Sequence, residues 1–284
     1  MKVKVFTLNS FAKTPTGGNP AGVVLTTDDL SEKQMMQISE KVGFSETAFV
    51  QKSNKADFKV RFFTPTDEVD LCGHATIATY FLMWNKNQIK SGSYKQETKA
   101  GILGIEIEKE GTIFMNQNLP RFFEELDKPK IADSLNIPVG YIDPALPIQI
   151  VSTGLKDIFV PITSIDRLYE IQPNSKKMSA INKQTGTIGY HVFTLETKFN
   201  STAHCRNFAP LYGIPEESAT GTSNGALSCY LYKHGKISNS QLSRLVFEQG
   251  YLMNRPSEIL AKLNGDAAPA PAAPERQAER SEAS

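Results

Sequence analysis

The sequence predicts an α+β protein made of two pseudo-symmetric halves. Strand-like segments outnumber helical ones and helices are interspersed among them, which favours mixed halves over a doubly wound sheet. A strand–loop–helix motif also occurs twice in the chain. Between its copies, NLPRFFEELDKP (118–129) interrupts the pattern and is the candidate linker. We therefore expect one half over residues 1–118 and the other over 119–264, followed by a tail over 265–284.

The elements of the first half follow from alternation and capping. KVKVF (2–6) alternates lysine with valine and predicts a half-buried strand. Ser31 and Gln34 form a capping box ahead of an apolar stripe, and Gly43 ends that predicted helix. The other expected elements are a turn and strand over 17–25, strands over 44–50 and 57–63, a helix from near His74, and a hairpin over 101–117.

The second half shows the same mixture of elements. Its expected strands and helices are a short helix at 132–136, strands over 147–153 and 157–162, a helix near 165–171, strands near 187–195 and 201–208, a helix over 224–233, and strands near 244–252 and 258–263. The tail over 265–284 is rich in alanine and proline and has no large apolar residue. We expect it to be disordered, either as a natural tether or as an added tag.

Composition excludes several classes of protein. The 284 residues are 40% hydrophobic and 21% charged, with a formal net charge of +1 and no basic run, which argues against nucleic-acid or anionic-membrane partners. No apolar run approaches the roughly 20 residues of a membrane helix, and the N-terminus lacks the pattern of a signal peptide. Three cysteines are too few for a disulfide framework, so we expect a cytoplasmic protein.

The duplicated motif predicts where a site would lie. RFFTP (61–65) matches RNFAP (206–210), and ATIATYFL (75–82) matches GALSCYLY (225–232), which places Tyr80 opposite Tyr230. Each copy opens its helix at a glycine, Gly73 or Gly221. Duplicated halves tend to form a crevice, and each helix start offers unpaired N–H groups with a partial positive charge. Two converging helix starts could hold a carboxylate or a developing enolate oxygen.

Six segments occur together in one order: GNPAGV (18–23), FSETAFV (44–50), RFFTP (61–65), LCGHAT (71–76), RNFAP (206–210) and ATGT (219–222). This order resembles the PhzF-like (phenazine-biosynthesis-like) proteins, relatives of diaminopimelate epimerase, over roughly residues 1–260. The resemblance implies two pseudo-symmetric halves, each a curled mixed β-sheet or barrel around a central helix, with the site in the cleft between them. It also implies a homodimer, no metal, no organic cofactor, and isomerisation of a small anionic metabolite by proton transfer.

Glu46 is the first candidate catalytic residue. In the expected strand it shares a face with apolar residues, and burial there would disfavour the charged carboxylate, which suits a group that alternates between acid and base. The residues alone also fit a Glu on the wet face of an edge strand, or in a first helical turn behind Ser45. The resemblance identifies the Glu of the S-E-T motif as the catalytic acid/base, and we adopt that interpretation.

Cys72 and Thr220 occupy matching positions before the two helices. A helix N-terminus should lower the pKa of Cys72 and make it a plausible base. The epimerase relatives use two such cysteines, one from each half, whereas the second position here is Thr220. We therefore keep Cys72 and Thr220 as secondary candidates and prefer a packed thiol for Cys72. Cys205 and Cys229 are expected in the core.

His74 and Glu217 complete the catalytic candidates. The resemblance makes His74 a substrate-orienting or proton-handling residue, while the residue pattern alone fits a helix-entry His that bonds backbone. The family pattern E-D-P-A-T-G reads here as EESATG (216–221), so Glu217 stands at the active-site Asp and Ser218 replaces the Pro. The alternative for Glu217 is a solvated loop charge.

The substrate-binding candidates are Asn19, Gly73, Gly221 and Thr222. The last takes the place of a family Ser and keeps a hydroxyl beside Gly221. His234 is interpreted as a cation at a helix C-terminus, and the polar residues that receive no role are His191, His204 and Arg255. No glycine-rich dinucleotide loop is present, so NAD and FAD have no support.

The sequence therefore predicts a cofactor-independent isomerase that moves a proton on a small carboxylate-bearing metabolite, with Glu46 as the acid/base. Two alternatives stay open. One is an epimerase or racemase that uses Cys72, and the other is a non-catalytic metabolite- or partner-binding protein of the same fold.

Overall fold

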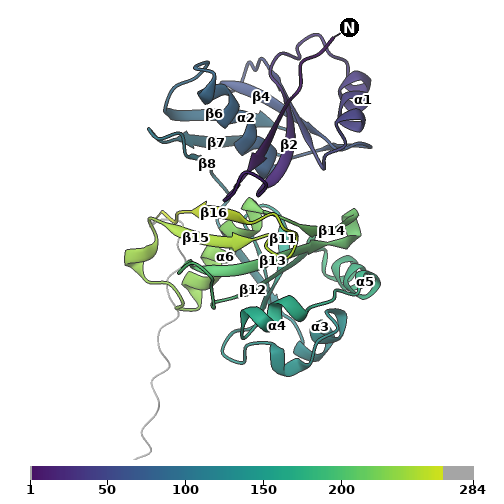
Figure 1. The fold of residues 1–284 in the computed structure, drawn as a ribbon, viewed down its shortest axis with the longest axis vertical. Coiled ribbons are helices and arrows are strands. Elements are labelled where there is room, and N and C mark those ends of the chain that lie inside the picture. The colour runs from purple at the N-terminus through teal and green to yellow at the C-terminus, as the bar shows by residue number, and fades with distance from the viewer. Residues whose placement is uncertain (1, 265–284) are drawn as a thin grey trace, which may run out of the picture.

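The computed structural model describes residues 2–264 and shows two lobes stacked along the long axis (Figure 1). The upper lobe holds the first sheet and helices α1 (Glu32–Val42) and α2 (Gly73–Asn85). Its strands are β1 (Phe6–Ser10), β2 (Asn19–Val24), β3 (Thr47–Gln51), β4 (Phe58–Phe63), β5 (Glu68–Val69), β6 (Gly92–Thr98), β7 (Gly101–Ile107) and β8 (Ile113–Met115).

The lower lobe holds the second sheet. Its helices are α3 (Lys128–Ser134), α4 (Ile165–Glu170), α5 (Ser175–Thr185) and α6 (Gly221–Lys233), with short 3-10 turns η1 (Val139–Tyr141), η2 (Pro210–Tyr212) and η3 (Asn239–Gln241). Its strands are β9 (Arg121–Glu125), β10 (Gln149–Ser152), β11 (Lys156–Pro161), β12 (Gly189–Thr194), β13 (Ala203–Ala209), β14 (Ile214–Glu217), β15 (Leu245–Gln249) and β16 (Ser257–Ala261).

The two sheets repeat one topology, which confirms the predicted fold class. The first has the order β1-β2-β3-β4-β6-β7-β8 with β5 on β4, and the second β16-β15-β13-β12-β11-β10-β9 with β14 on β13. Across the first sheet from β1 to β7, the pairing of neighbouring strands alternates between antiparallel and parallel. Across the second sheet from β10 to β16, the pairings alternate in the same order. Each central helix lies against its own sheet (Figure 1).

The helix register differs from the one that the sequence suggested. Both central helices have 13 residues, and both begin at a glycine whose capping residue, Cys72 or Thr220, makes no side-chain cap. Aligned by their ends, they place His74 opposite Thr222. Tyr80 then lies opposite Ser228, so the predicted match with Tyr230 is wrong. Size and apolarity could not define the register, because both helices are buried around most of their circumference.

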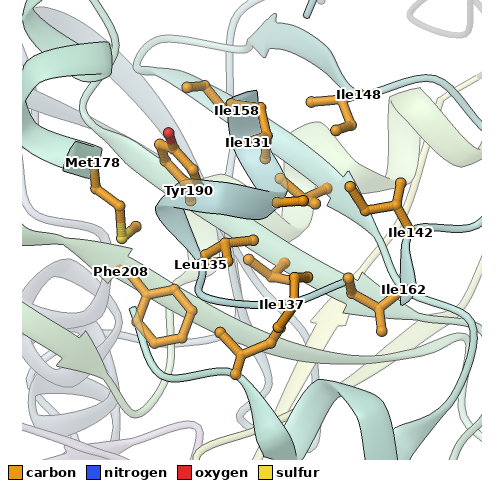
Figure 2. Packing of buried hydrophobic residues seen from close by; sticks show 14 of the residues in the cluster. Ile131, Leu135, Ile137, Ile142, Ile148, Ile158, Ile162, Met178, Tyr190 and Phe208 are labelled. Carbon is orange, nitrogen blue, oxygen red and sulfur yellow. The ribbon is translucent and has the colours of Figure 1, made fainter. Parts of the chain in front are cut away.

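Buried side chains hold each central helix in place. Ala75, Ala78 and Leu82 of α2 pack with Ala48 and Phe62 of the first sheet. In the second half, α6 covers one face of the sheet, while the other face carries a separate cluster of α3 and α5 side chains around Tyr190 and Phe208 (Figure 2). Strands β12 and β13 are consequently buried at every residue. Close packing of this kind fixes the position of the helix starts.

Several element boundaries differ from the expected ones. The first strand starts at Phe6 rather than residue 2, and Val3 and Val5 pack instead near α1. The candidate linker contains strand β9, and strand β6 and helix α5 were not expected. The proposed boundary at 118/119 falls between β8 and β9. The tail prediction lies outside the described residues. Within residues 2–264, every helix is too short or too polar to cross a membrane.

Candidate active site

Glu46 lies just before β3, at the entrance of α2. Its backbone carbonyl accepts a hydrogen bond from Gly22 N (3.2 Å), and its side chain is 15% exposed. Carboxylate Oε2 is buried, lies 3.3 Å from His74 Nε2 and has no hydrogen-bond partner within residues 2–264. The expected strand position was wrong, because β3 begins at Thr47 and is buried on both faces through Val50. Glu46 points inward because it immediately precedes the strand, and not because inward and outward residues alternate along the strand.

His74 is the second residue of α2 and is only 5% exposed. Burial lowers the pKa of His74, opposed by the charge of Glu46 and by a hydrogen bond to the Pro20 backbone. The imidazole is therefore neutral near pH 7. Its Nδ1 lies 3.7 Å from Glu217 Oε1, so the ring stands between the two carboxyl groups. The Ser10 hydroxyl donates a 2.6 Å hydrogen bond to the backbone carbonyl of His74.

Glu217 ends β14 and comes from the second half. Its carboxylate accepts hydrogen bonds from Asn19 Nδ2 (2.8 Å) and Thr220 Oγ1 (2.5 Å). Burial raises the pKa of Glu217 to about 7, and the charge of Glu46 adds to that rise, while the bonds from Thr220 and Asn19 oppose it. This carboxyl is thus close to half-protonated at neutral pH, which is the condition that favours proton exchange. Glu217 is therefore not a solvated loop charge, which was the alternative interpretation from the sequence.

Cys72 precedes α2 and is 6% exposed, with its Sγ 3.4 Å from His74 Nδ1. Burial raises the pKa of the Cys72 thiol well above its ordinary value, and the nearby Glu46 carboxylate adds to the rise. The expectation that the helix start would lower this pKa is wrong, because burial and adjacent carboxylates outweigh the helix dipole. Cys72 is therefore a neutral thiol at pH 7. Cys205 and Cys229 are buried, as expected.

Asn19 joins the two halves. The residue is 5% exposed on β2, and its amide donates both to Glu217 and to the Ala219 carbonyl (3.0 Å). Ser218 Oγ donates to the Gly18 carbonyl at 3.0 Å, so the residue that replaces the expected Pro makes its own contact across the junction. The structure thus brings Glu46, His74, Cys72, Asn19, Glu217 and Thr220 into one cluster.

Two further residues reach this region: Gln249, which the sequence analysis missed, and Arg255, to which it gave no role. Gln249 is fully buried at the end of β15 and donates to the Glu217 carbonyl (2.8 Å) and to Thr220 Oγ1 (3.1 Å). Arg255 Nε donates to the Gly18 carbonyl at 3.0 Å. The only sequence signal for Gln249 was its position as a polar residue in the largely apolar strand LVFEQ. The contact of Arg255 joins segments 237 residues apart and leaves no local pattern.

The two helix starts contact each other. A Cβ placed on Gly73 would lie 3.6 Å from Thr222 Cγ2, and one on Gly221 would lie 3.0 Å from the Phe11 ring. A cavity of about 230 Å³ is lined by both glycines and continues along Ile77 and Gly225. Glu46, His74 and Glu217 do not line this cavity, so it meets the polar cluster only at the helix starts. The unpaired N–H groups there can bind an anion.

The two helix entrances differ in chemistry. Phe63 pairs with Thr47 in the first sheet, and its motif counterpart Phe208 pairs with Tyr190 in the second. The residue equivalent to Glu46 is therefore Gly189. A Cβ at Gly189 would lie 2.2 Å from the Phe208 carbonyl oxygen, so no side chain fits there. Because Thr222 also stands opposite His74, an acid at the Glu46 position and an imidazole occur at the first entrance alone, and the second half contributes the carboxyl of Glu217 instead.

Other histidines have structural partners. His191 is buried between Asn207 (3.0 Å) and Asn224 (3.2 Å), and burial lowers its pKa to about 4. His204 Nδ1 lies 2.7 Å from Glu248. His234 ends α6 at the expected place, but burial lowers its pKa, so the predicted cation there is wrong. Among the described residues, one set of metal-type donors gathers within 4.8 Å: Glu46, Cys72 and His74.

Comparison with known proteins places this geometry in context. The chain matches the family described as "Phenazine biosynthesis-like protein" over residues 8–276. It is 36% identical over 270 residues to the Bacillus subtilis protein named uncharacterized isomerase YfhB, covering 93% of this chain and 91% of that one. It is 29% identical to a Pseudomonas fluorescens protein named trans-2,3-dihydro-3-hydroxyanthranilate isomerase, covering 92% and 90%. A Bacillus anthracis PhzF-family crystal structure superposes with a TM-score of 0.83 at 34% identity, covering 92% and 90%.

Proposed function

Because the chain belongs to the phenazine-biosynthesis-like family of isomerases, we propose that it moves a proton on a small carboxylate-bearing metabolite by Glu46 acid/base catalysis. The observation that carries the proposal is the row Glu46–His74–Glu217, with separations of 3.3 Å and 3.7 Å, at the contact between two helix starts. The predicted family and enzyme class are confirmed by the comparisons. The substrate and the role of each residue are part of the proposal.

In this mechanism the substrate carboxylate lies at the N–H groups of Gly73 and Gly221, where the helix dipoles favour negative charge. The Glu46 carboxylate removes a proton from one carbon of the substrate. The electron pair delocalises toward the carboxylate, and the developing oxyanion is stabilised by the same N–H groups. Glu46 exchanges its proton with solvent and then delivers a proton to a second carbon. Proton transfer by a positioned group contributes on the order of 10²–10⁴ in rate.

His74 and Glu217 act on the acid/base and on the substrate. The neutral imidazole is adjacent to Glu46 Oε2 and can donate a proton to it or accept one from it as its protonation changes. Glu217, with a pKa of about 7, can present a neutral carboxyl that donates a hydrogen bond to a polar group of the substrate. Asn19 and Thr220 fix its orientation.

The difference between the two entrances supports isomerisation over inversion. A two-base racemase needs a base on each face of the reacting carbon. Here the second entrance has Gly189 and Thr222 in place of Glu46 and His74, and Thr220 in place of Cys72. A single base removes and returns the proton on one face, which relocates it without inverting a centre.

The test is incubation with candidate metabolites in heavy water, starting with trans-2,3-dihydro-3-hydroxyanthranilate because a relative is named for that substrate. Wild type should introduce solvent deuterium at a carbon, detected by mass spectrometry. Glu46→Gln should reduce the rate by about 10²–10⁴, while Cys72→Ser should retain most of it.

Two outcomes contradict the proposal. If Cys72→Ser abolishes exchange and Glu46→Gln has little effect, the epimerase alternative is correct. If a metabolite binds wild type tightly but never gains deuterium in any pH condition, the protein is a binding protein of this fold. Circular dichroism of each variant controls for unfolding.

A further inference from the structure

We propose that Glu46, Cys72 and His74 form a zinc-binding site in which Zn²⁺ switches off the acid/base cluster. The inhibitory consequence rests on the proposed function, whereas the binding itself does not. Zinc is placed here as an inhibitor of the proposed reaction, whose steps use no metal, and not as a cofactor.

The first support is donor geometry. Each of the three side chains offers one ligand atom, and the three atoms lie within 4.8 Å of one another. His74 Nε2 is 3.3 Å from Glu46 Oε2 and 3.9 Å from Cys72 Sγ. In a tetrahedral zinc site, bonds of about 2.0 Å to nitrogen and oxygen and about 2.3 Å to sulfur separate the ligand atoms by roughly 3.3–3.6 Å. The nitrogen–oxygen separation already fits this range, the nitrogen–sulfur separation exceeds it by a few tenths of an ångström, and the oxygen–sulfur pair lies within 4.8 Å.

The second support is donor chemistry. A thiolate, an imidazole and a carboxylate together favour zinc over magnesium or calcium, which prefer oxygen ligands. Three protein ligands leave a fourth position for water or a substrate oxygen. On binding, the metal takes the Cys72 sulfur as thiolate and the thiol proton passes to solvent. Cys72 has no task in the proposed isomerisation, so this gives a function to a residue that the reaction does not use.

The third support lies in the groups behind the ligands. Metal-binding histidines almost always donate their other ring N–H to a carboxylate or a backbone carbonyl. Behind His74 both kinds of group are close, because the Pro20 backbone hydrogen-bonds the ring and Glu217 Oε1 lies 3.7 Å from Nδ1, a little beyond hydrogen-bond distance. Glu217 is itself held by Asn19 and Thr220. Glu46 Oε2, buried and without a hydrogen-bond partner in residues 2–264, is the kind of acceptor that a cation would satisfy.

Zinc in this position blocks the proposed reaction for a direct reason. The Glu46 carboxylate that would accept the substrate proton becomes a metal ligand, and so does the adjacent His74 nitrogen. Neither can then exchange a proton. Metal binding and turnover are mutually exclusive at these atoms.

The binding test uses full-length protein stripped of metal with a chelator. Zinc affinity is measured by competition with a chromophoric chelator, and Co²⁺ is added separately as a spectroscopic probe. We expect one equivalent of tight binding and a thiolate-to-cobalt charge-transfer band. Cys72→Ser should remove the band and weaken zinc binding by more than about tenfold, and Glu46→Gln should weaken binding while keeping the band. Cys229→Ser, a change to another buried thiol, should alter neither.

Zinc that binds wild type and Cys72→Ser with equal affinity, or cobalt without a charge-transfer band, would overturn the site and indicate surface coordination. Melting temperatures of the variants show whether a loss of binding reflects unfolding. Turnover is measured first in chelator and then, without chelator, with added zinc. Zinc should inhibit wild type at concentrations at which Cys72→Ser keeps its activity. Absence of turnover with the zinc site intact would refute only the proposed function.

Discussion

The amide of Asn19 donates a 2.8 Å hydrogen bond to Glu217, a residue 198 positions away in the other half of the molecule. The bond joins the first-half entrance, with Glu46 and His74, to the only carboxyl that the second half contributes to the described cluster. The cluster is therefore assembled by both halves, although its acid/base row is anchored in one. The position of one half relative to the other should therefore control the protonation of this cluster.

Asn19→Ala tests this link. The bond from Asn19 lowers the pKa of Glu217 against the effect of burial, so its loss should move that pKa further above 7. A pH–rate profile should show the corresponding limb displaced to higher pH, and urea unfolding should show a loss of about 1–3 kcal/mol in unfolding free energy, because Glu217 Oε1 loses its Asn19 donor. Asn54→Ala, at an exposed position between β3 and β4, is the control. An unshifted pH limb would contradict the link.

The pH dependence of stability should depend on Glu217. Its pKa is about 7 in the folded protein and 4.5 ordinarily, so between these values the folded state binds more protons than the unfolded chain. Stability from this group is fully present below about pH 4.5 and is lost as the pH rises through 7. Asp157, with a pKa raised by burial to about 6, contributes with the same sign.

Glu217→Gln should therefore flatten the decline in unfolding free energy between pH 5 and 7 by on the order of 2–3 kcal/mol. Urea unfolding at several pH values measures it. Glu124→Gln, at an exposed position, is the control. Parallel curves for wild type and Glu217→Gln would show that the pKa of this carboxyl is not raised.

Gly22→Ala should disturb the position of Glu46. A Cβ at Gly22 would lie 2.7 Å from Thr47 Oγ1 and 2.9 Å from its Cγ2, and Gly22 N also bonds the Glu46 carbonyl. Thr47 is β-branched and fully buried, so it cannot simply rotate away. We expect a loss of about 1–3 kcal/mol in unfolding free energy and a lower exchange rate.

The double variant Gly22→Ala with Thr47→Ala should recover part of this loss, because the clashing methyl and hydroxyl are removed. Gly140→Ala, where a Cβ meets no atom within 4 Å, should be neutral. Equal stability of Gly22→Ala and Gly140→Ala would show that the contact is not limiting.

The repeated arginines should differ in importance. Arg61 makes a two-pronged ion pair with Glu68 (2.7 and 2.8 Å), and Arg206 makes one with Glu216 (2.9 and 2.8 Å). Arg206 is more buried and also donates to the Leu168 and Ile171 carbonyls. When Arg61 is removed, Lys99 still lies 3.2 Å from Glu68. Arg206→Ala should therefore cost about 3–5 kcal/mol and Arg61→Ala clearly less, as measured by urea unfolding. The reverse order would contradict this account.

The repeated arginine motif illustrates what local pattern can reveal. R-x-F marks the same strand in both sheets, and the glycine that follows marks the start of both central helices. Duplication, the α+β class and the family could be read from these segments because spacing and residue type carry them. The helix register could not, since buried helices tolerate apolar residues on nearly every face.

The sequence by itself determined which side chains form the candidate cluster, because acid, imidazole and hydroxyl groups are recognisable one at a time in their motifs. Only the tertiary structure decided their chemical states. It made Cys72 a neutral thiol and raised the pKa of Glu217 to about 7, and it placed Gln249 behind the second entrance. These states depend on desolvation and on neighbours up to some 200 residues distant, and neither is written in any local stretch of chain.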